Sequence, residues 1–247
     1  MTWIKICGMT NLEDALLAVD AGADAVGFVF YEKSPRSITV EAAREIVERL
    51  PERIEKIGVF VIGDGVEPVD VFIQVGLTGT QSYRSLENGA QHGPKKAIGL
   101  SCLPTRARFL MALPMNLFGE DEGQIERLAS NFAKWGKNIP EEFPMPIPEG
   151  LMDTIVLDSG ELRLPGGTGK TFDWKKAVPV GEGMRKGGVK LVVAGGLTAE
   201  NVGEAIGTLR PWGVDVVSGV EARPGKKDPE KLRAFVKAVR AADRKVS

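Results

Sequence analysis

Short apolar runs alternate with amphipathic segments along the whole chain, and this alternation limits the folds open to it more than any other feature. Eight runs have the near-continuous apolar character of parallel strands that are covered on both faces. They lie at roughly residues 3–7, 25–30, 56–61, 75–81, 96–101, 154–158, 190–195 and 214–218. Five segments between or after them carry apolar residues at positions i, i+3, i+4 and i+7, the spacing of one helix face. These segments are 12–19, 43–50, 125–132, 202–209 and 232–239.

Strand and helix patterns that alternate without a linker predict an α/β fold with a parallel sheet, and eight such units predict closure into a (β/α)8 TIM barrel. The length of 247 residues fits one such barrel, so we expect residues 1–247 to form a single domain. The alternative is an open, doubly wound sheet, because the number of units does not by itself show closure.

The pattern is irregular in the middle of the chain. Between Arg84 and Gly93 we expect a shortened fourth helix, because no apolar stripe is present there. The fifth connection, residues 103–150, is expected to be long and to contain a helix. Its end is rich in proline, at positions 140, 144, 146 and 148. Connections of this length are usually active-site lids or tolerated insertions, and both interpretations stay open.

Composition and charge exclude several classes of function. The formal net charge of −1 argues against a nucleic-acid partner, which requires an excess of clustered Lys and Arg. No apolar run reaches the roughly 18 residues of a membrane span, so no membrane partner is expected. Cys7, Cys102 and His92 are too few for a Cys/His metal site or a disulfide framework. With no secretory signal pattern, these features predict a cytoplasmic protein without a metal.

Cys7 ends the first strand run, where the chemistry of a TIM barrel is located. Thr10 and Glu13 have the spacing of a capping box, so we expect a helix to begin directly after it. A helix N-terminus lowers the pKa of a nearby thiol and favours the thiolate, which can act as a base. The alternative is that Cys7 is a small buried hydrophobic residue.

Further polar residues stand after other strand runs. Gln81 and Tyr83 follow the fourth run and Asp158 ends the sixth, while Arg36 lies in the loop after the second. The planar guanidinium of Arg36 can bind a carboxylate through two hydrogen bonds, although surface arginines are common. Asp158 can be an acid of the site, or a helix cap or ion-pair partner.

Three glycine-rich loops are expected at the same end of the barrel. They contain Gly167 and Gly169, then Gly195 and Gly196, and then Ser218 and Gly219; Thr198 is expected to cap the helix after the second of them. Loops after the seventh and eighth strands commonly form a phosphate site in TIM barrels. A nucleotide P-loop is excluded at Gly169-Lys170-Thr171, because Leu164 stands where that motif requires glycine. For any single loop, glycine in a tight turn is the alternative.

Together these motifs resemble the phosphoribosylanthranilate isomerase family, the (β/α)8 enzymes of tryptophan biosynthesis. The matching stretches are residues 5–11, 22–30, 33–36, 58–61, 157–158, 166–174, 194–197 and 214–221. The resemblance implies an Amadori rearrangement of a small phosphorylated substrate, without a cofactor, in a monomer or homodimer. It also implies that Cys7 is the general base and Asp158 the general acid.

The same resemblance assigns the substrate contacts. Arg36 is expected to hold the anthranilate carboxylate, and Gln81 and Tyr83 are expected to contact the substrate. The phosphate is expected at the backbone of six residues: Gly167, Gly169, Gly195, Gly196, Ser218 and Gly219.

The fourth strand region departs from the family pattern. Residues 81–84 read Gln-Ser-Tyr-Arg, where the family usually has Gln-Leu-His-Gly. Either Tyr83 or His92 could replace the missing histidine. Two alternative functions therefore remain: a related phosphosugar isomerase of histidine biosynthesis, whose first strand ends in aspartate rather than Cys7, and a non-catalytic barrel that binds a phosphorylated ligand.

Overall fold

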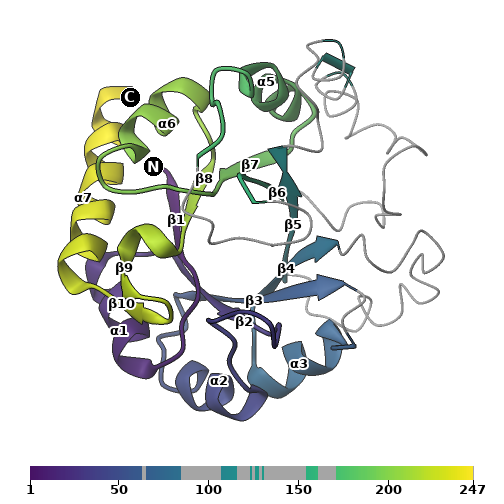
Figure 1. Ribbon diagram of the computed structural model, residues 1–247, viewed down its shortest axis with the longest axis vertical. Helices are drawn as coiled ribbons and strands as arrows, with labels where there is room; N and C mark the ends of the chain where they lie inside the picture. The colour runs from purple at the N-terminus through teal and green to yellow at the C-terminus, as the bar shows by residue number, and fades with distance from the viewer. Residues whose placement is uncertain are drawn as a thin grey trace.

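The eight main strands close into a parallel barrel. The computed structural model describes residues 1–62, 65–84, 107–115, 123, 126–127, 130, 154–160 and 171–246. Within these residues, each strand from β1 to β8 pairs with the next, and β8 pairs with β1 (Figure 1). The predicted (β/α)8 barrel is confirmed, and closure rules out the open sheet.

The strands and helices follow one another in the predicted order. The barrel strands are β1 (Trp3–Ile6), β2 (Ala25–Val29), β3 (Glu55–Ile62), β4 (Gly79–Arg84), β5 (Arg108–Pro114), β6 (Thr154–Asp158), β7 (Lys190–Val193) and β8 (Gly213–Val216). The helices are α1 (Leu12–Ala21), α2 (Val40–Val47), α3 (Pro68–Val75), α5 (Val178–Lys186), α6 (Val202–Leu209), the short 3-10 helix η3 (Ser218–Val220) and α7 (Pro229–Val246). A small hairpin of β9 (Glu221–Arg223) and β10 (Lys226–Lys227) precedes α7.

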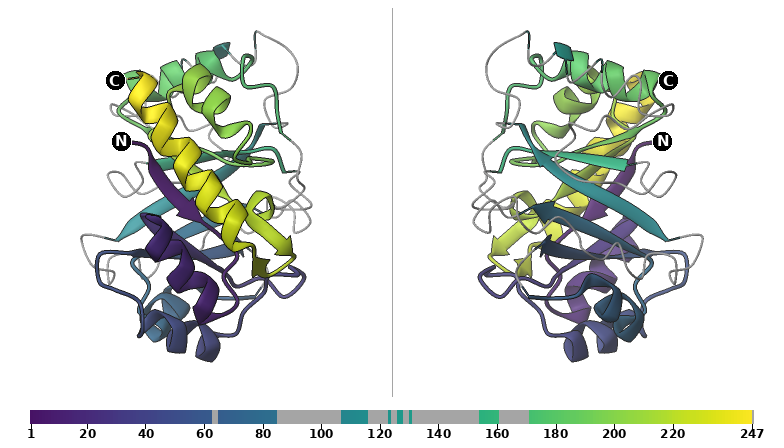
Figure 2. Two further views of the ribbon diagram at one scale, coloured as in Figure 1. Left: turned by 90° about the vertical axis from the view of Figure 1, so that its left-hand side faces the viewer. Right: turned by 90° about the vertical axis from the view of Figure 1, so that its right-hand side faces the viewer.

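Two hydrophobic clusters hold the barrel together. The larger one fills the space between the strands and the surrounding helices, and the smaller one fills the barrel interior with residues such as Trp3, Ile57 and Val156. Figure 2 shows α7 lying along the outside of β1. Asp243 of α7 accepts hydrogen bonds from the Thr2 backbone at 3.0 Å and from its hydroxyl at 2.6 Å, which ties the two ends of the chain together.

The fifth strand differs from the prediction. It is Arg108–Pro114, which lies inside the expected 103–150 connection, whereas the predicted run 96–101 is outside the described residues. The stretch Arg-Phe-Leu-Met-Ala-Leu-Pro contains several good helix formers, so intrinsic propensity does not favour a strand there. Pairing with β4 on one side and β6 on the other overrides that propensity.

The fourth strand also starts later than predicted. Helix α3 continues to Val75, and β4 begins at Gly79. Gln81 and Tyr83 therefore lie within the strand, two residues apart on one face, instead of following it.

The helix predictions hold where the structure describes them, but two caps are different. Segments 12–19, 43–50, 202–209 and 232–239 overlap α1, α2, α6 and α7, while most of 125–132 and the shortened fourth helix lie outside the described residues. Helix α1 is capped by Asn11, whose side chain accepts from the Asp14 backbone at 2.9 Å, and α6 begins after Asn201. Thr10 is not the cap of α1, because Asn11 holds that position, and Thr198 is not the cap of α6, because Asn201 does. Of the helices that the structure describes, none is long and apolar enough to cross a membrane.

Candidate active site

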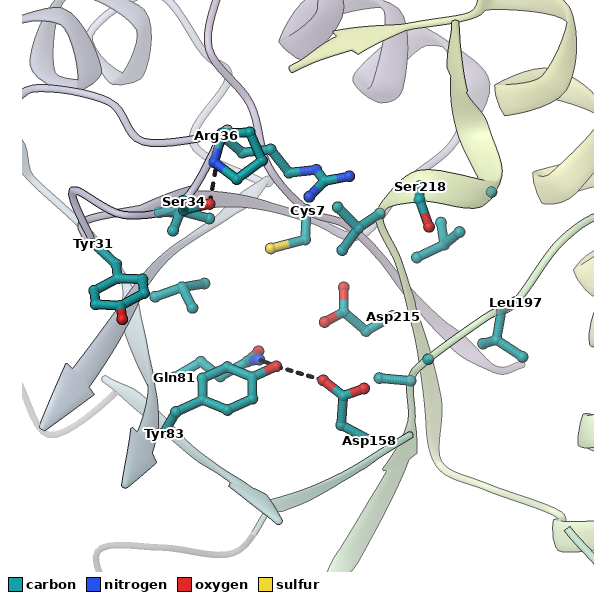
Figure 3. Close-up of a pocket in the computed structure, with 18 of the residues that line it drawn as sticks. Cys7, Tyr31, Ser34, Arg36, Gln81, Tyr83, Asp158, Leu197, Asp215 and Ser218 are labelled. Atoms are coloured by element: carbon teal, nitrogen blue, oxygen red, sulfur yellow. Dashed lines mark hydrogen bonds between the residues drawn. The ribbon is translucent and has the colours of Figure 1, made fainter. Parts of the chain in front are cut away.

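The carboxyl ends of the strands surround one cavity, which we call the barrel mouth. Cys7 from the end of β1, Asp158 from β6 and Asp215 from β8 point toward its centre (Figure 3). Its wall also includes Arg36, Gln81, Tyr83, Gly195, Gly196 and Leu197. Ser218 and Gly219 complete the side near β8. The structure thus brings together every predicted site residue that it describes.

Cys7 is a free, buried cysteine on the barrel interior. Gly27 of β2 makes room for its side chain, since a Cβ at Gly27 would lie 2.5 Å from Cys7 Sγ. Burial raises the pKa of the Cys7 thiol, and the nearby charge of Lys5 opposes that rise without reversing it. The prediction of a lowered thiol pKa is therefore wrong for this structure, because burial disfavours the charged thiolate more than Lys5 and Lys227 favour it.

Asp158 lies across the barrel mouth from Cys7 and is 3% exposed. Tyr83 Oη donates to Asp158 Oδ2 at 2.8 Å, and the Gly160 backbone N–H donates to Oδ1 at 3.0 Å. Gln81 Nε2 in turn donates to Tyr83 Oη at 3.1 Å. Burial raises the pKa of Asp158, and the two hydrogen bonds reduce the rise without cancelling it. A carboxyl group with a raised pKa is suited to act as an acid.

Arg36 faces the same cavity in a fixed orientation. Its Nε and Nη2 donate to Glu221 Oε1 and Oε2 at 2.9 and 2.7 Å, a bidentate pair. Lys227 Nζ also donates to Glu221 Oε1, at 3.2 Å. Burial alone would raise the pKa of Glu221, but Arg36 and Lys227 outweigh it and the pKa is lowered. Glu221 therefore remains ionised and holds one edge of the guanidinium, leaving the other edge for a ligand.

A second buried ion pair lies deeper in the barrel. Lys5 Nζ donates to Asp215 Oδ2 at 2.8 Å, and the two side chains are 0% and 3% exposed. The predicted site residues did not include Lys5, Asp215, Glu221 or Lys227. A signal was present for the first two, because each is a charged residue inside an otherwise apolar strand run, Ile4-Lys5-Ile6 and Val214-Asp215-Val216.

Two glycine loops form the remaining wall of the barrel mouth. Gly195 and Gly196 have φ values of 86° and 60°, a backbone conformation that favours glycine. Gly219 approaches the same loop so closely that a Cβ would lie 1.9 Å from Leu197 O. Main-chain groups after β7 and β8 thus meet at one side of the cavity, as a phosphate site requires. Gly167, Gly169 and His92 lie outside the described residues.

The cavity combines three chemical functions. It has a thiol and a carboxyl group on opposite sides, a cation that can bind a carboxylate, and a wall of closely spaced backbone. Such a site can add a proton at one position of a bound molecule and remove one at another.

Comparison with known proteins points to one family. The family model described as N-(5'phosphoribosyl)anthranilate (PRA) isomerase matches residues 4–73 and 145–238. The N-(5'-phosphoribosyl)anthranilate isomerase of Pelobacter propionicus is 40% identical over 237 residues, 96% of this chain and 95% of that protein. The isomerase of Thermotoga maritima is 41% identical over 237 residues, 96% of this chain and 98% of that protein.

Solved structures agree with the sequence relatives. The phosphoribosyl anthranilate isomerase structure from Thermotoga maritima has a TM-score of 0.72 and 36% identity, and the match covers 98% of this chain and 100% of that one. A structure of such an isomerase in complex with reduced 1-(o-carboxyphenylamino)-1-deoxyribulose 5-phosphate has a TM-score of 0.69 and 35% identity, with the same coverage. The Thermotoga maritima isomerase is also described as dimeric.

Proposed function

The chain belongs to the N-(5'-phosphoribosyl)anthranilate isomerase family, and on that premise we propose that it converts N-(5-phosphoribosyl)anthranilate into 1-(2-carboxyphenylamino)-1-deoxyribulose 5-phosphate. The reaction is an Amadori rearrangement, in which an aminoaldose becomes an aminoketose. It moves hydrogen within one molecule, so it needs an acid and a base but no external oxidant or reductant.

Asp158 is the general acid of the first step. Its carboxyl proton goes to the ribose ring oxygen, the bond from that oxygen to C1′ breaks, and the nitrogen lone pair forms a Schiff base with C1′. The raised pKa of Asp158, which burial causes, supports this role because it keeps a proton available on the carboxyl group.

Cys7, as a thiolate, is the general base of the second step. It removes the C2′ proton, and the electrons of that C–H bond form a double bond to C1′ and neutralise the nitrogen. The enolamine then loses its hydroxyl proton at O2′ and gains a proton at C1′, which gives the ketone. The position of Cys7 across the cavity from Asp158 supports this division of roles.

The other groups bind the two anionic ends of the substrate. Arg36 receives the anthranilate carboxylate on the guanidinium edge that Glu221 leaves open. The phosphate lies at the backbone of Gly195, Gly196, Ser218 and Gly219, with Gly167 and Gly169 as further predicted contacts. Gln81 and Tyr83 form the wall between these ends, and Tyr83 also orients Asp158.

The single observation that carries the proposal is that Cys7, Asp158, Arg36 and both glycine loops line one cavity. The test is to follow the loss of phosphoribosylanthranilate fluorescence with the unmodified chain, with Cys7→Ala and with Asp158→Ala. We expect turnover by the unmodified chain and a loss of about 10²–10⁴-fold in kcat for each variant, the usual contribution of an acid or base.

Cys102→Ser is the matched control, since it removes the other thiol of the chain and should leave turnover near its original level. Circular dichroism checks that each variant is folded. Near-normal turnover by both site variants would contradict the proposal. Calorimetric binding of the substrate without any product would instead indicate a non-catalytic barrel, and turnover of the aminoimidazole carboxamide ribotide substrate alone would indicate the isomerase of histidine biosynthesis.

A further inference from the structure

Lys5 and Asp215 form a buried ion pair that the steps above do not use. They lie directly opposite each other in the register of β1 and β8, and the distance from Lys5 Nζ to Asp215 Oδ2 is 2.8 Å. Both side chains are inside the barrel, where the remaining packing is supplied by apolar residues such as Trp3 and Ile57.

A buried ion pair is weak support for a fold. The desolvation of two charges often exceeds the energy of their attraction, and well-packed apolar residues of the same volume are usually as stable or more so. The presence of this pair in the barrel interior is therefore better explained by something that needs its charge.

Cys7 is the reacting group next to that charge. Lys5 lies in β1 and Cys7 directly follows that strand. The Cys7 backbone N–H donates to Val216 O of β8 at 2.9 Å, so Cys7 continues the alternation of the strand and both side chains point into the barrel. A Cβ at Gly27 would lie 2.5 Å from Cys7 Sγ and 3.0 Å from Lys5 Cε, so the missing side chain of Gly27 leaves one space in which the two side chains meet.

We propose that Lys5 is a positioning residue for the base: its ammonium, fixed by Asp215, stabilises the negative charge on Cys7 Sγ so that the thiolate is available to remove the C2′ proton. The proposal rests on the proposed function of Cys7 and deepens it. An ammonium has three N–H donors, and Asp215 Oδ2 takes one of them, so donors remain that can face the sulfur.

Three other groups face Cys7, and none of them replaces Lys5. Lys227 Nζ is directed to the Cys7 and Val217 carbonyls at 2.6 and 3.3 Å and to Glu221 at 3.2 Å, so Glu221 compensates its charge. Asp215 is negative and opposes a thiolate. Burial raises the pKa of Tyr83 well above its usual value, so Tyr83 stays neutral and supplies no charge that could stabilise the sulfur. Lys5 is therefore the cation that acts most strongly on the sulfur.

The electrostatics agree with this geometry. Burial raises the pKa of Cys7, and Lys5 is the largest effect that opposes the rise. Burial lowers the pKa of Lys5, but Asp215 and Cys7 more than offset this, so Lys5 stays protonated. Asp215 thus keeps the charge on Lys5, and Lys5 favours the charge on Cys7.

The test is a titration of the thiolate in a Cys102→Ser background, in which Cys7 is the only thiol of the chain. The ultraviolet absorbance of the thiolate is followed against pH with and without Lys5→Met, and a Cys7→Ser variant supplies the baseline. We expect Lys5→Met to move the midpoint to higher pH. At neutral pH we expect kcat/KM to fall about 10- to 1,000-fold, because an opposite charge at about 4–6 Å shifts a pKa by about 1–3 units.

The pH dependence of activity separates this role from a structural one. If Lys5→Met only reduces the thiolate population, its deficit in kcat/KM disappears at pH values above both thiol midpoints. An unchanged midpoint, or a deficit that persists at alkaline pH, would overturn the proposal. Lys56→Met is the control for the loss of a buried lysine, since Lys56 Nζ donates to Pro51 O and Lys56 does not line the barrel mouth; it should leave the midpoint unchanged.

Lys5→Met leaves the buried Asp215 carboxylate unpaired, which can prevent folding. The double variant Lys5→Met/Asp215→Asn removes that unpaired charge. It should show a smaller shift of the midpoint in the same direction, because the opposing effect of Asp215 is lost as well; no shift in the double variant would also contradict the proposal. The titration needs no substrate. If Lys5→Met shifts the thiolate midpoint as expected but the unmodified chain shows no turnover, the proposed function is rejected and the interaction of Lys5 with Cys7 is not.

Discussion

Charged and aromatic side chains contact one another at one end of the barrel, whereas charged side chains face a cavity at the other end. At the amino ends of the strands, Arg108 pairs with Glu55 at 2.6 and 2.8 Å. The Arg108 guanidinium also lies 4.8 Å from the Trp212 ring centre, and Trp212 stacks on Trp3 at 5.0 Å. At the barrel mouth, in contrast, Cys7, Asp158 and Arg36 all face a cavity.

The difference shows where the fold can accept unfavourable burial. Oδ1 of Asp215 and Oε1 of Gln81 are buried at or near the cavity without a hydrogen-bond partner among the described residues. At the amino end Nε1 of Trp3 also has no partner among those residues, but it belongs to a neutral indole in an aromatic stack, whereas Asp215 is a charged carboxylate. A buried polar atom without a partner destabilises a fold, so such atoms are expected where a ligand can satisfy them. The amino end should therefore contribute to stability and the barrel mouth to activity, and the variants below test that separation.

The largest effect is expected for Asp158→Asn. The change should lower kcat by about 10²–10⁴-fold, the usual contribution of a general acid. It should leave the melting temperature the same or higher, because burial raises the pKa of Asp158 and the ionised form is therefore unfavourable in the fold. Glu55→Gln is the same chemical change at the opposite end and should give the reverse result, with kcat unchanged and stability lowered. Equal effects on kcat would remove the distinction between the ends.

Glu221→Gln should weaken substrate binding. It removes the charge that orients Arg36, so we expect KM to rise about tenfold with little change in kcat, since a hydrogen bond to a charged group contributes about 1.5–3 kcal/mol. The pKa of Glu221 is lowered in the fold, so its contribution to stability is present above the unfolded pKa and is lost as the pH falls through the folded pKa. Urea unfolding over a pH series should therefore show a weaker acid-induced loss of stability in the variant. A steeper loss would contradict this assignment.

Tyr83→Phe should have a smaller effect, of no more than about tenfold in kcat, because one hydrogen bond to the acid is lost. The Tyr83 hydroxyl favours the ionised form of Asp158, so its removal raises the pKa of Asp158 further. The two limbs of the kcat/KM profile follow the pKa values of Asp158 and Cys7. Asp158 has the lower of these two pKa values and sets the acid limb, which should therefore move to higher pH. A profile identical to that of the unmodified chain would show that Tyr83 does not act on the acid.

Arg108→Met should have the smallest effect, and only on stability. Its pair with Glu55 is partly exposed, and such pairs and cation–π contacts each contribute up to about 1 kcal/mol, so we expect a loss of about 1 kcal/mol in the free energy of unfolding. The value of kcat should not change. A loss of activity at constant stability would show that the amino end also influences the site.

The sequence predicted the elements that depend on local pattern. The strand runs around Ile6, Val26 and Val192 are apolar because they are covered on both faces, and that signal needs no knowledge of their partners. The positions of Cys7, Asp158, Arg36 and the two described glycine loops at one cavity then follow from the barrel itself.

The rest depends on contacts between distant segments, which no local pattern contains. Lys5 and Asp215 are 210 residues apart and Arg36 and Glu221 are 185 apart, so neither ion pair is visible before the barrel closes. The fifth strand was misplaced for a similar reason, since its pairing with β4 and β6 decides its conformation. The lowered pKa predicted for Cys7 was wrong because the closed barrel buries the thiol, and burial outweighs the nearby charges of Lys5 and Lys227.

The central claim is that Cys7 and Asp158 act on one molecule from opposite sides, and a crystal structure with the reduced product analogue tests it most directly. We predict Cys7 Sγ in contact with the carbon that corresponds to C2′, and the Asp158 carboxyl within hydrogen-bond distance of the former ring oxygen. The phosphate should lie at the backbone of Gly195, Gly196, Ser218 and Gly219. An analogue bound with either Cys7 or Asp158 out of reach of these atoms would contradict the account.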